Sequence, residues 1–465
     1  MPKFVPISQE DPMSTLCRMV LATRYEDLPS NVIDHAKKGI LHILGATIGG
    51  SAMEGIPTVV DFVKDKGGKA ESIIPFYGGK VPASEAAFAI GPMSRAMQLG
   101  DGHPEGSHCS EYVFPTLLAT TGLKEKVSGK EFLTAFVVGQ ELLIRIGIAY
   151  KALSKAVPLG RYGGHFIFGC VAAAGKLLDL SLDELENAQG IAGTMTQPHS
   201  VLMFSPGTLM GRVHQGFICQ DTINACLLTQ RGITGPRRDI LAAPQGFLGF
   251  AKWETDAGAA LKGLGEEWEI LNVYRPCFPA SATVQRAIGG MLDQVREHNF
   301  KGEDIARIDI DVHTGVYTHA HRKVKWNPQT AADGQHSMPY VTATAACNGD
   351  FFIDAYTPEA MARQDVRDLM TNLSISEDAS LSRLGTRITT TLKDGTKYSK
   401  VYPYVKGHPE EPLTEQEVIE IFKKCVPYSA YKLSDGTVDS VINAVLNIEK
   451  VDDIAEALLA PLTPK

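Results

Sequence analysis

The feature that most constrains the fold is a change in the spacing of apolar residues along the chain. Through the first ~270 residues they recur at helical intervals, as they do between Val32 and Leu44. Later they alternate with polar residues, as in Ile308-Asp309-Ile310-Asp311-Val312, which is typical of a half-buried strand. Helical spacing returns after Thr414. The pattern predicts a mainly α protein with a smaller α+β part inserted into it.

The positions of these changes predict two domains. We expect a large helical domain formed by residues 1–270 and 408–465, and an inserted α+β domain at 271–407. Within the insert, the residues on either side of Asp394-Gly395 predict a hairpin with a type I′ turn. Within the helical domain, the Ala- and Gly-rich stretch 169–180 predicts close approach of neighbouring helices. A cleft between the domains is the expected ligand site.

Composition narrows the classes of function. The chain has 465 residues, of which 44% are hydrophobic and 21% charged, and its net charge is −8. These values are ordinary for a globular protein, and the acidic balance argues against a nucleic-acid partner. We find no run of ~18 uncharged apolar residues, so no membrane span is expected. Eight scattered cysteines and a start without signal-peptide character predict a reduced, cytoplasmic protein.

The common cofactor motifs are missing from the sequence. There is no phosphate-binding glycine loop, no G-x-S-x-G nucleophile elbow and no H-E-x-x-H. The histidines at 313, 319 and 321 have no acidic or thiol residue at a suitable spacing, so we interpret them as structural or solvent-exposed. We therefore expect a reaction that needs neither a metal nor an organic cofactor.

The strongest candidate for chemistry is the Gly-rich loop from Asp101 to Glu111. It holds two histidines and three carboxylates between two apolar segments. Such groups are costly there unless they are paired or face a cleft. His108 held by a carboxylate such as Asp101 would suit proton transfer near neutral pH. Helix capping and a solvated turn would explain the same residues without any catalytic function.

Two further stretches carry candidate residues. Arg212 and the amide groups of residues 207–216, at the start of a predicted helix, could bind a carboxylate. An arginine on a helix surface is the alternative interpretation. Tyr340, in Gln335-His336-Ser337-Met338-Pro339-Tyr340, could donate a proton, although an amphipathic core residue is commoner at such a position.

These stretches, in this order, resemble motifs of the MmgE/PrpD family, which contains 2-methylcitrate dehydratases, cis-aconitate decarboxylases and iminodisuccinate epimerase. The segment from Ala86 to Asp101 is similar to the family's "AA-x-x-N-G … H-A-x-D-F-D-D", and His108 falls on its "H-P-G/S". The remaining matches are Thr234-Gly235-Pro236 with "G-F-T-G-P", His336-Ser337-Met338-Pro339-Tyr340 with "H-S-x-x-Y", and the segment from Lys406-Gly407 to Pro412-Leu413 with "K-G-x-x-x-x-P-L". The resemblance covers nearly the whole chain.

The resemblance implies a helical domain built from both chain ends, a lid domain, a homodimer, and an active site between the domains that uses no cofactor. It also assigns roles to single residues. Asp101 and His108 look like the acid and the imidazole of the catalytic loop, and Tyr340 like the tyrosine of the lid. His165 is similar to a histidine at a helix start, and Arg212 and His214 match the "K-R-L-H" block.

Several positions depart from the family pattern. Gly211 stands at the lysine of "K-R-L-H", and Val273-Tyr274-Arg275-Pro276-Cys277 replaces "K-x-Y-P-C/S". Gly100 replaces the first Asp of "D-D", and Cys109 replaces the Pro after the histidine. Two ammonium groups are thereby lost, and Arg212 and Arg275 are the expected replacements for binding carboxylates.

The expected activity is that of a lyase of the 2-methylcitrate dehydratase type acting on a small di- or tricarboxylate. In this hypothesis His108, oriented by Asp101, removes the proton next to a carboxylate, and Tyr340 protonates the departing hydroxyl. Arg212 and Arg275 would hold the carboxylates. The alternatives are an epimerase or racemase of a dicarboxylate, a cis-aconitate-type decarboxylase, and a catalytically silent homologue that serves as a dimeric binding protein.

Overall fold

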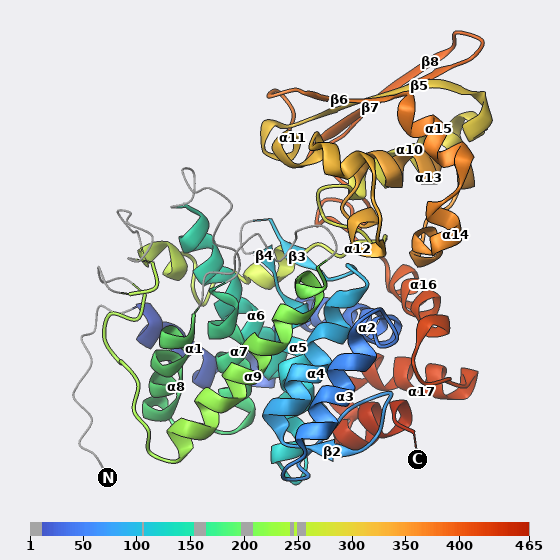
Figure 1. Ribbon diagram of the computed structural model, residues 1–465. Helices are drawn as coiled ribbons and strands as arrows, with labels where there is room; N and C mark the ends of the chain where they lie inside the picture. The colour runs from blue at the N-terminus through green and yellow to red at the C-terminus, as the bar shows by residue number, and fades with distance from the viewer. Residues whose placement is uncertain are drawn as a thin grey trace.

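The protein consists of a helical body and a smaller α+β domain above it in the view of Figure 1. The structure, a computed structural model, describes residues 12–104, 107–152, 164–196, 208–241, 246–248 and 257–464. Both ends of the described chain contribute to the body. Its helices are α1 (Pro12–Ala22), α2 (Ser30–Gly50), α3 (Ile56–Lys66), α4 (Ala83–Ala96), α5 (Ser110–Thr120), α6 (Gly129–Ala152), α7 (Phe166–Leu177), α8 (Leu182–Met195), α9 (Met210–Gln230), α16 (Glu415–Cys425) and α17 (Asp435–Leu446).

Glycines allow the central helices of the body to approach closely. Helices α6 and α7 cross at Gly139 and Gly169, and a Cβ on Gly169 would lie 2.5 Å from the carbonyl oxygen of Gly139. Helices α4 and α9 cross in the same way at Gly91 and Gly216. The close approach predicted from the small residues of 169–180 is thus confirmed at Gly169.

Helix α6 is apolar because it runs through the core of the body. Gly129–Tyr150 is long and apolar enough to cross a membrane, yet 94% of its most apolar 18-residue window is buried inside the protein. The helix also carries Glu141 and Arg145, a buried ion pair with a 2.7 Å contact. Within the described part of the chain it is the one helix of this kind, and its burial is that of a core helix.

The α+β domain contains a four-stranded mixed sheet with helices packed on one face (Figure 1). The strand order is β6-β5-β7-β8, with β5 and β6 parallel and the other neighbours antiparallel. The alternation around Ile308 and Ile310 lies in β5, where these side chains are buried. The elements are α10 (Gln285–His298), β5 (Ile305–Val312), α11 (Thr314–Ala320), α12 (Ala331–Gly334), α13 (Met338–Asn348), α14 (Pro358–Met361), α15 (Gln364–Thr371), β6 (Leu373–Glu377), β7 (Thr386–Leu392) and β8 (Lys397–Tyr402).

The predicted hairpin is present between β7 and β8, but its turn is not type I′. A type I′ turn needs positive φ at both central residues, and only Gly395 of this turn has it, at 90°. The amide of Gly395 donates to Leu392 O at 3.0 Å, and the amide of Leu392 donates to Thr396 O at 2.8 Å. This is a three-residue loop with a glycine bulge. Asp394 Oδ1 accepts from the Thr396 amide at 2.8 Å, which favours this loop over the two-residue one.

The chain re-enters the body after the sheet. Helix α16 packs against α2, and Tyr428, just beyond α16, donates a hydrogen bond to Asp354 of the α+β domain. A second contact joins the domains at the end of α4, where Gln335 Nε2 donates to Met97 O at 3.2 Å. The second contact joins residues that are 238 positions apart in the chain.

Candidate active site

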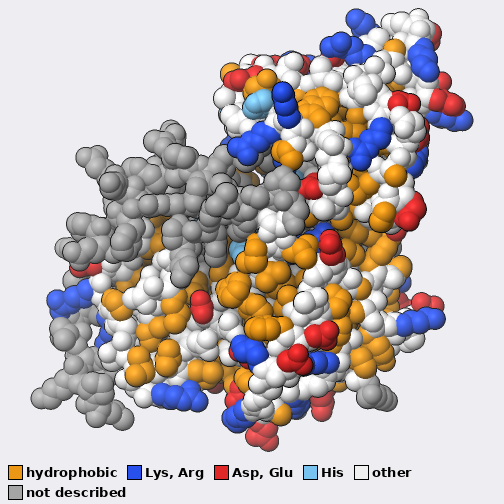
Figure 2. All heavy atoms as spheres, viewed as in Figure 1, with side chains coloured by type: hydrophobic (Ala, Val, Ile, Leu, Met, Phe, Trp, Pro, Cys, Tyr) orange, Lys and Arg blue, Asp and Glu red, His pale blue; other side chains and the backbone are white. Residues whose placement is uncertain are grey.

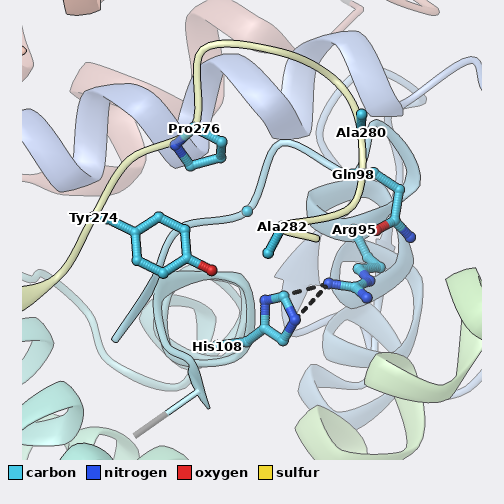
Figure 3. A pocket seen from close by; sticks show the side chains of 8 residues that line it. Arg95, Gln98, His108, Tyr274, Pro276, Ala280 and Ala282 are labelled. Carbon is cyan, nitrogen blue, oxygen red and sulfur yellow. Dashed lines mark hydrogen bonds between the residues drawn. The ribbon is translucent and has the colours of Figure 1, made fainter. Parts of the chain in front are cut away.

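A small hollow lies where the chain passes from the helical body into the α+β domain. The empty space among its lining residues, including the part that is open to solvent, is about 230 Å³. One side comes from α4 and the loop before α5, and the other from the segment that leads into α10 (Figure 3). The lining residues are Arg95, Gln98, Gly100, His108, Tyr274, Pro276, Ala280 and Ala282.

Two short strands place His108 in this hollow. Strand β3 (Gly102–His103) pairs with β4 (Ser107–His108), so that the backbone of His108 lies opposite Gly102. On its other side Gly102 forms a two-bond bridge with Tyr274, with N···O distances of 2.8 and 3.1 Å. This pairing brings the imidazole and the phenol to the same hollow although 166 positions separate them along the chain.

A buried ion pair stands beside the imidazole. Arg95 Nη1 donates to Glu111 Oε1 at 2.8 Å, and it lies 3.4 Å from each ring nitrogen of His108. Burial lowers the pKa of His108 well below its ordinary value, the Arg95 charge lowers it further, and a hydrogen bond to the Asp101 backbone opposes both. Glu111 Oε1 lies 3.5 Å from His108 Nδ1, but its charge is shared with Arg95. His108 is therefore neutral at neutral pH.

The second polar layer behind Arg95 comes from α9. We orient the Gln215 amide with its oxygen toward Arg95 Nε, at 3.2 Å, because its nitrogen then donates to His214 Nδ1 at 3.0 Å. The opposite orientation offers one long contact of 3.5 Å to Glu111. His214 Nε2 lies 3.1 Å from Tyr112 Oη. His214 is thus connected to the hollow by hydrogen bonds that run through Gln215 and Arg95.

Asp101 acts on His108 through its backbone. Its carboxylate accepts from the Ser110 amide at 2.8 Å and from the Ser110 hydroxyl, at the start of α5. We expected the carboxylate itself to orient the imidazole; instead it caps a helix, and the Asp101 backbone holds His108. Burial raises the pKa of Asp101 to about 6, against the opposing charge of Arg275.

The two arginines expected to bind carboxylates do not line the hollow. Arg275 Nη2 donates to His35 O of α2 at 2.6 Å, and burial lowers the pKa of Arg275 to about 10. Arg212 is buried in the first turn of α9 and donates to Glu54 O at 3.2 Å. Among the described residues, no hydrogen-bond partner is found for Nε of either arginine or for Arg212 Nη2.

His165 lies near His108. It precedes α7, is buried, and stacks on Tyr150 with ring centroids 5.6 Å apart. Its charge is one of the influences that lower the pKa of His108. The loop histidine and the helix-start histidine are therefore close enough to affect each other.

Tyr340 lies in the interior of the α+β domain. It is fully buried, and its hydroxyl donates to Ala355 O. The neighbouring ring is Tyr356, at 6.2 Å between centroids. Tyr340 is absent from the wall of the hollow, which matches the core interpretation left open by the sequence. His336 belongs to the same motif and lies near the site. Burial lowers the pKa of His336 to about 3, and the charges of Lys325 and, to a smaller extent, Arg95 contribute to this shift.

Sequence reasoning missed four residues at the site: Arg95, Gln98, Glu111 as the partner of Arg95, and Tyr274. A signal for two of them was present. In the motif "H-A-x-D-F-D-D" that ends at Asp101, Arg95 stands at the histidine and Gln98 at the first aspartate. A weaker signal marks Tyr274, which lies in an irregular segment: the block "K-x-Y-P-C/S" has a tyrosine one position later, where this chain has Arg275.

No metal centre is found within the residues that the structure describes: no group of three or more His, Cys, Asp or Glu side chains is placed to hold an ion. His313 Nδ1 accepts from the Gly315 amide at 3.1 Å and caps α11. His321 is exposed and contacts Tyr317 O. The side chain of His319 lies outside the described part of the chain.

Comparison with known proteins identifies the family. Residues 14–256 match the MmgE/PrpD N-terminal domain, and residues 278–447 match the MmgE/PrpD C-terminal domain. A cis-aconitate decarboxylase-like protein of Aspergillus oryzae is 25% identical, covering 95% of both chains. The cis-aconitate decarboxylase of Mus musculus is 24% identical, covering 94% of this chain and 90% of its own.

A more distant relative is the mitochondrial 2-methylcitrate dehydratase of Yarrowia lipolytica, 23% identical over 80% of this chain and 76% of its own. The family models cover most of the chain, including Arg95 of α4 and His108 of β4. The chain therefore belongs to the MmgE/PrpD family.

Proposed function

We propose that this protein is a lyase that removes CO₂ from a small unsaturated tricarboxylate of the cis-aconitate type. The observation that carries the proposal is the His108 imidazole beside the Arg95 guanidinium, 3.4 Å away, in a small hollow between the two domains.

The two walls of the hollow differ in a way that suits decarboxylation. Arg95 and His108 form a polar wall, whereas Pro276, Ala280 and Ala282 are apolar. A carboxylate held against the apolar wall loses its charge as CO₂ forms, so the poorly solvating wall favours the product more than the reactant. The negative charge left on the substrate then develops near the Arg95 guanidinium.

The chemistry consumes one proton. The bond between the substrate carbon and the departing carboxylate breaks, and its electron pair shifts through the adjacent C=C bond of the substrate. A proton must then reach the far carbon of this allylic system from the site. A neutral imidazole can pass protons between solvent and the hollow, which is the role we propose for His108.

Elimination of water, as by a 2-methylcitrate dehydratase, is the second candidate and was the first choice from the sequence alone. The similarity to the Yarrowia lipolytica enzyme favours it. The same His108 would then remove the proton next to a carboxylate. We rank it second because the more similar relatives reported above are named for decarboxylation of cis-aconitate. Epimerisation of a dicarboxylate and a silent binding role are the remaining alternatives.

One incubation separates these activities. The purified chain is mixed with cis-aconitate, 2-methylcitrate, citrate and succinate-derived acids in deuterated water. We expect CO₂ release with one deuterium in the product from cis-aconitate. Formation of an alkene without CO₂ would indicate the dehydratase, and deuterium uptake without net change the epimerase. No reaction over the whole panel would overturn the proposal in favour of a silent homologue.

Replacement of His108 tests the assigned group. His108→Ala should reduce turnover by about 100-fold or more, because a positioned proton-transfer group typically contributes 10²–10⁴ in rate. His321→Ala is the matched control, since His321 is exposed and directly follows α11, away from the hollow. Near-normal turnover of His108→Ala would remove His108 from the mechanism.

We also propose that the protein is a homodimer. Three aromatic residues form an apolar patch on adjoining body helices: Phe62 of α3, Phe88 of α4 and Phe217 of α9. Phe62 and Phe217 are 55% and 45% exposed. Figure 2 shows hydrophobic side chains gathered on this face of the body. A second copy of the chain would remove these rings from water.

A further inference from the structure

We propose that Tyr274 is a catalytic residue whose phenol delivers the proton to the substrate carbon. This inference deepens the proposed function and rests on it. The family resemblance assigned the phenol to Tyr340, whose hydroxyl is bonded to Ala355 O inside the α+β domain. Tyr274 is the tyrosine that lines the hollow with His108.

The backbone fixes the Tyr274 side chain. The two-bond bridge to Gly102 makes this segment locally extended, so that successive side chains point to opposite sides. Tyr274 and Pro276 face the hollow, and Arg275 between them reaches His35 of α2. Figure 3 shows the Tyr274 hydroxyl directed to the middle of the hollow, on the side of His108.

Gly102 leaves the room that this phenol occupies. A Cβ built on Gly102 would lie 2.9 Å from Tyr274 Oη and 3.1 Å from Cζ. Such distances are shorter than van der Waals contact, so any side chain at position 102 would displace the phenol. The two residues are complementary although they come from different segments of the chain.

A buried cation supports charge on the phenol. Arg286, at the start of α10, is buried and donates to Pro403 O at 3.1 Å. Burial lowers the pKa of Arg286 to about 10. The largest influence that raises this pKa is the charge of the Tyr274 phenol. The guanidinium is thus close enough to stabilise a phenolate at Tyr274 while the proton is on the substrate.

The proposed step balances as follows. When the carbon–carboxylate bond breaks, its electron pair shifts through the adjacent C=C bond, and the far carbon of this allylic system takes the proton of Tyr274 Oη. The resulting phenolate regains a proton from solvent through His108. Each turnover releases one CO₂ and consumes one solvent proton, and no oxidant or reductant is needed.

The test compares Tyr274→Phe with wild type, using the acid that the wild-type chain decarboxylates. We expect kcat to fall by about 100-fold or more, with KM and the affinity for propane-1,2,3-tricarboxylate changed by less than about threefold. In deuterated water the wild type should place deuterium on one face of the product carbon. The residual product of Tyr274→Phe should lose this preference, because solvent then supplies the proton.

Two further variants sharpen the result. Gly102→Ala retains the phenol but displaces it, and it should also lower kcat. Tyr398→Phe on β8, where Tyr398 stacks on His298, is the matched control and should retain wild-type turnover. Wild-type kcat and facial selectivity in Tyr274→Phe, with loss of both in Tyr340→Phe, would overturn the inference and leave the proposed function standing. A wild type inactive on every acid would overturn both.

Discussion

The guanidinium of Arg95 lies 3.4 Å from both ring nitrogens of His108 while it holds Glu111 at 2.8 Å. The imidazole, of which 17% is exposed, thus lies beside a cation that is itself neutralised. Because burial and Arg95 lower the pKa of His108, neutral imidazole persists below pH 6.5. The acid limb of the pH profile of kcat/KM should therefore lie below pH 6.5. A pH–rate profile, together with an NMR titration of His108, would measure its position.

Two changes to the charges beside His108 should place this limb at different pH values. Glu111→Gln removes a carboxylate 3.5 Å from Nδ1 and leaves Arg95 uncompensated, so the limb should move to lower pH. The double variant Arg95→Gln/Glu111→Gln removes the cation as well, so its limb should lie at higher pH than that of Glu111→Gln. Limbs at the same pH in both variants would contradict this electrostatic account.

Asp101 should make stability depend on pH. Its pKa is raised to about 6 in the folded protein, so folding binds a proton between its ordinary pKa of 3.8 and about 6. The associated stability is full below pH 3.8 and is lost as pH rises through about 6. This difference corresponds to about 3 kcal/mol. Asp101→Asn does not ionise, so relative to wild type it should gain stability between pH 4 and pH 7.5.

Urea denaturation of both proteins at the two pH values measures this effect. The side-chain amide introduced by Asp101→Asn can still accept from the Ser110 amide, so the helix cap is retained in part. A free-energy difference between variant and wild type that is equal at pH 4 and pH 7.5 would show that Asp101 titrates normally.

The helical body could be predicted because its signal is local and repeated. The spacing between Val32 and Leu44 lies in α2, and the alternation at Ile308 and Ile310 lies in β5. The loop holding His108 could also be found, because polar groups crowded between apolar helices need a reason to be there. The predicted type of the hairpin turn was wrong, because Asp394 Oδ1 accepts a hydrogen bond from the Thr396 amide and so favours a longer loop.

The partners of His108 could not be predicted in the same way. Tyr274 is positioned by a single bridge to Gly102, a contact without any periodic signal. Arg275 was chosen as a replacement for a lost lysine, yet alternation along an extended segment turns it toward α2. Tyr340 is on a helix within the α+β domain, and which face of that helix meets the body depends on how the whole domain packs.

Gly169 should tolerate no side chain. A Cβ there would lie 2.5 Å from Gly139 O and 2.4 Å from Leu143 Cβ, so α6 and α7 would have to move apart. Gly169→Ala should cost about 1–3 kcal/mol of unfolding free energy, the usual range for overpacking a core. Gly193→Ala on α8 is the matched control, because its nearest neighbour would be at 3.6 Å, and it should be neutral or stabilising. Equal unfolding free energies in urea for both variants would contradict the close crossing.

The aromatic patch on α3, α4 and α9 should control the oligomeric state. Phe88 and Phe217 pack with ring centroids 4.9 Å apart, and Phe62 lies 6.2 Å from Phe88, so the rings form one surface. Phe217→Asp would place a carboxylate on this surface, and burying it against a second copy would be costly. Sedimentation velocity should show a dimer for wild type and a monomer for Phe217→Asp. Val401→Asp is the matched control, since Val401 is 43% exposed on β8 of the α+β domain, and it should leave the dimer intact. A monomeric wild type, or dissociation by Val401→Asp but not by Phe217→Asp, would rule out this patch as the subunit interface.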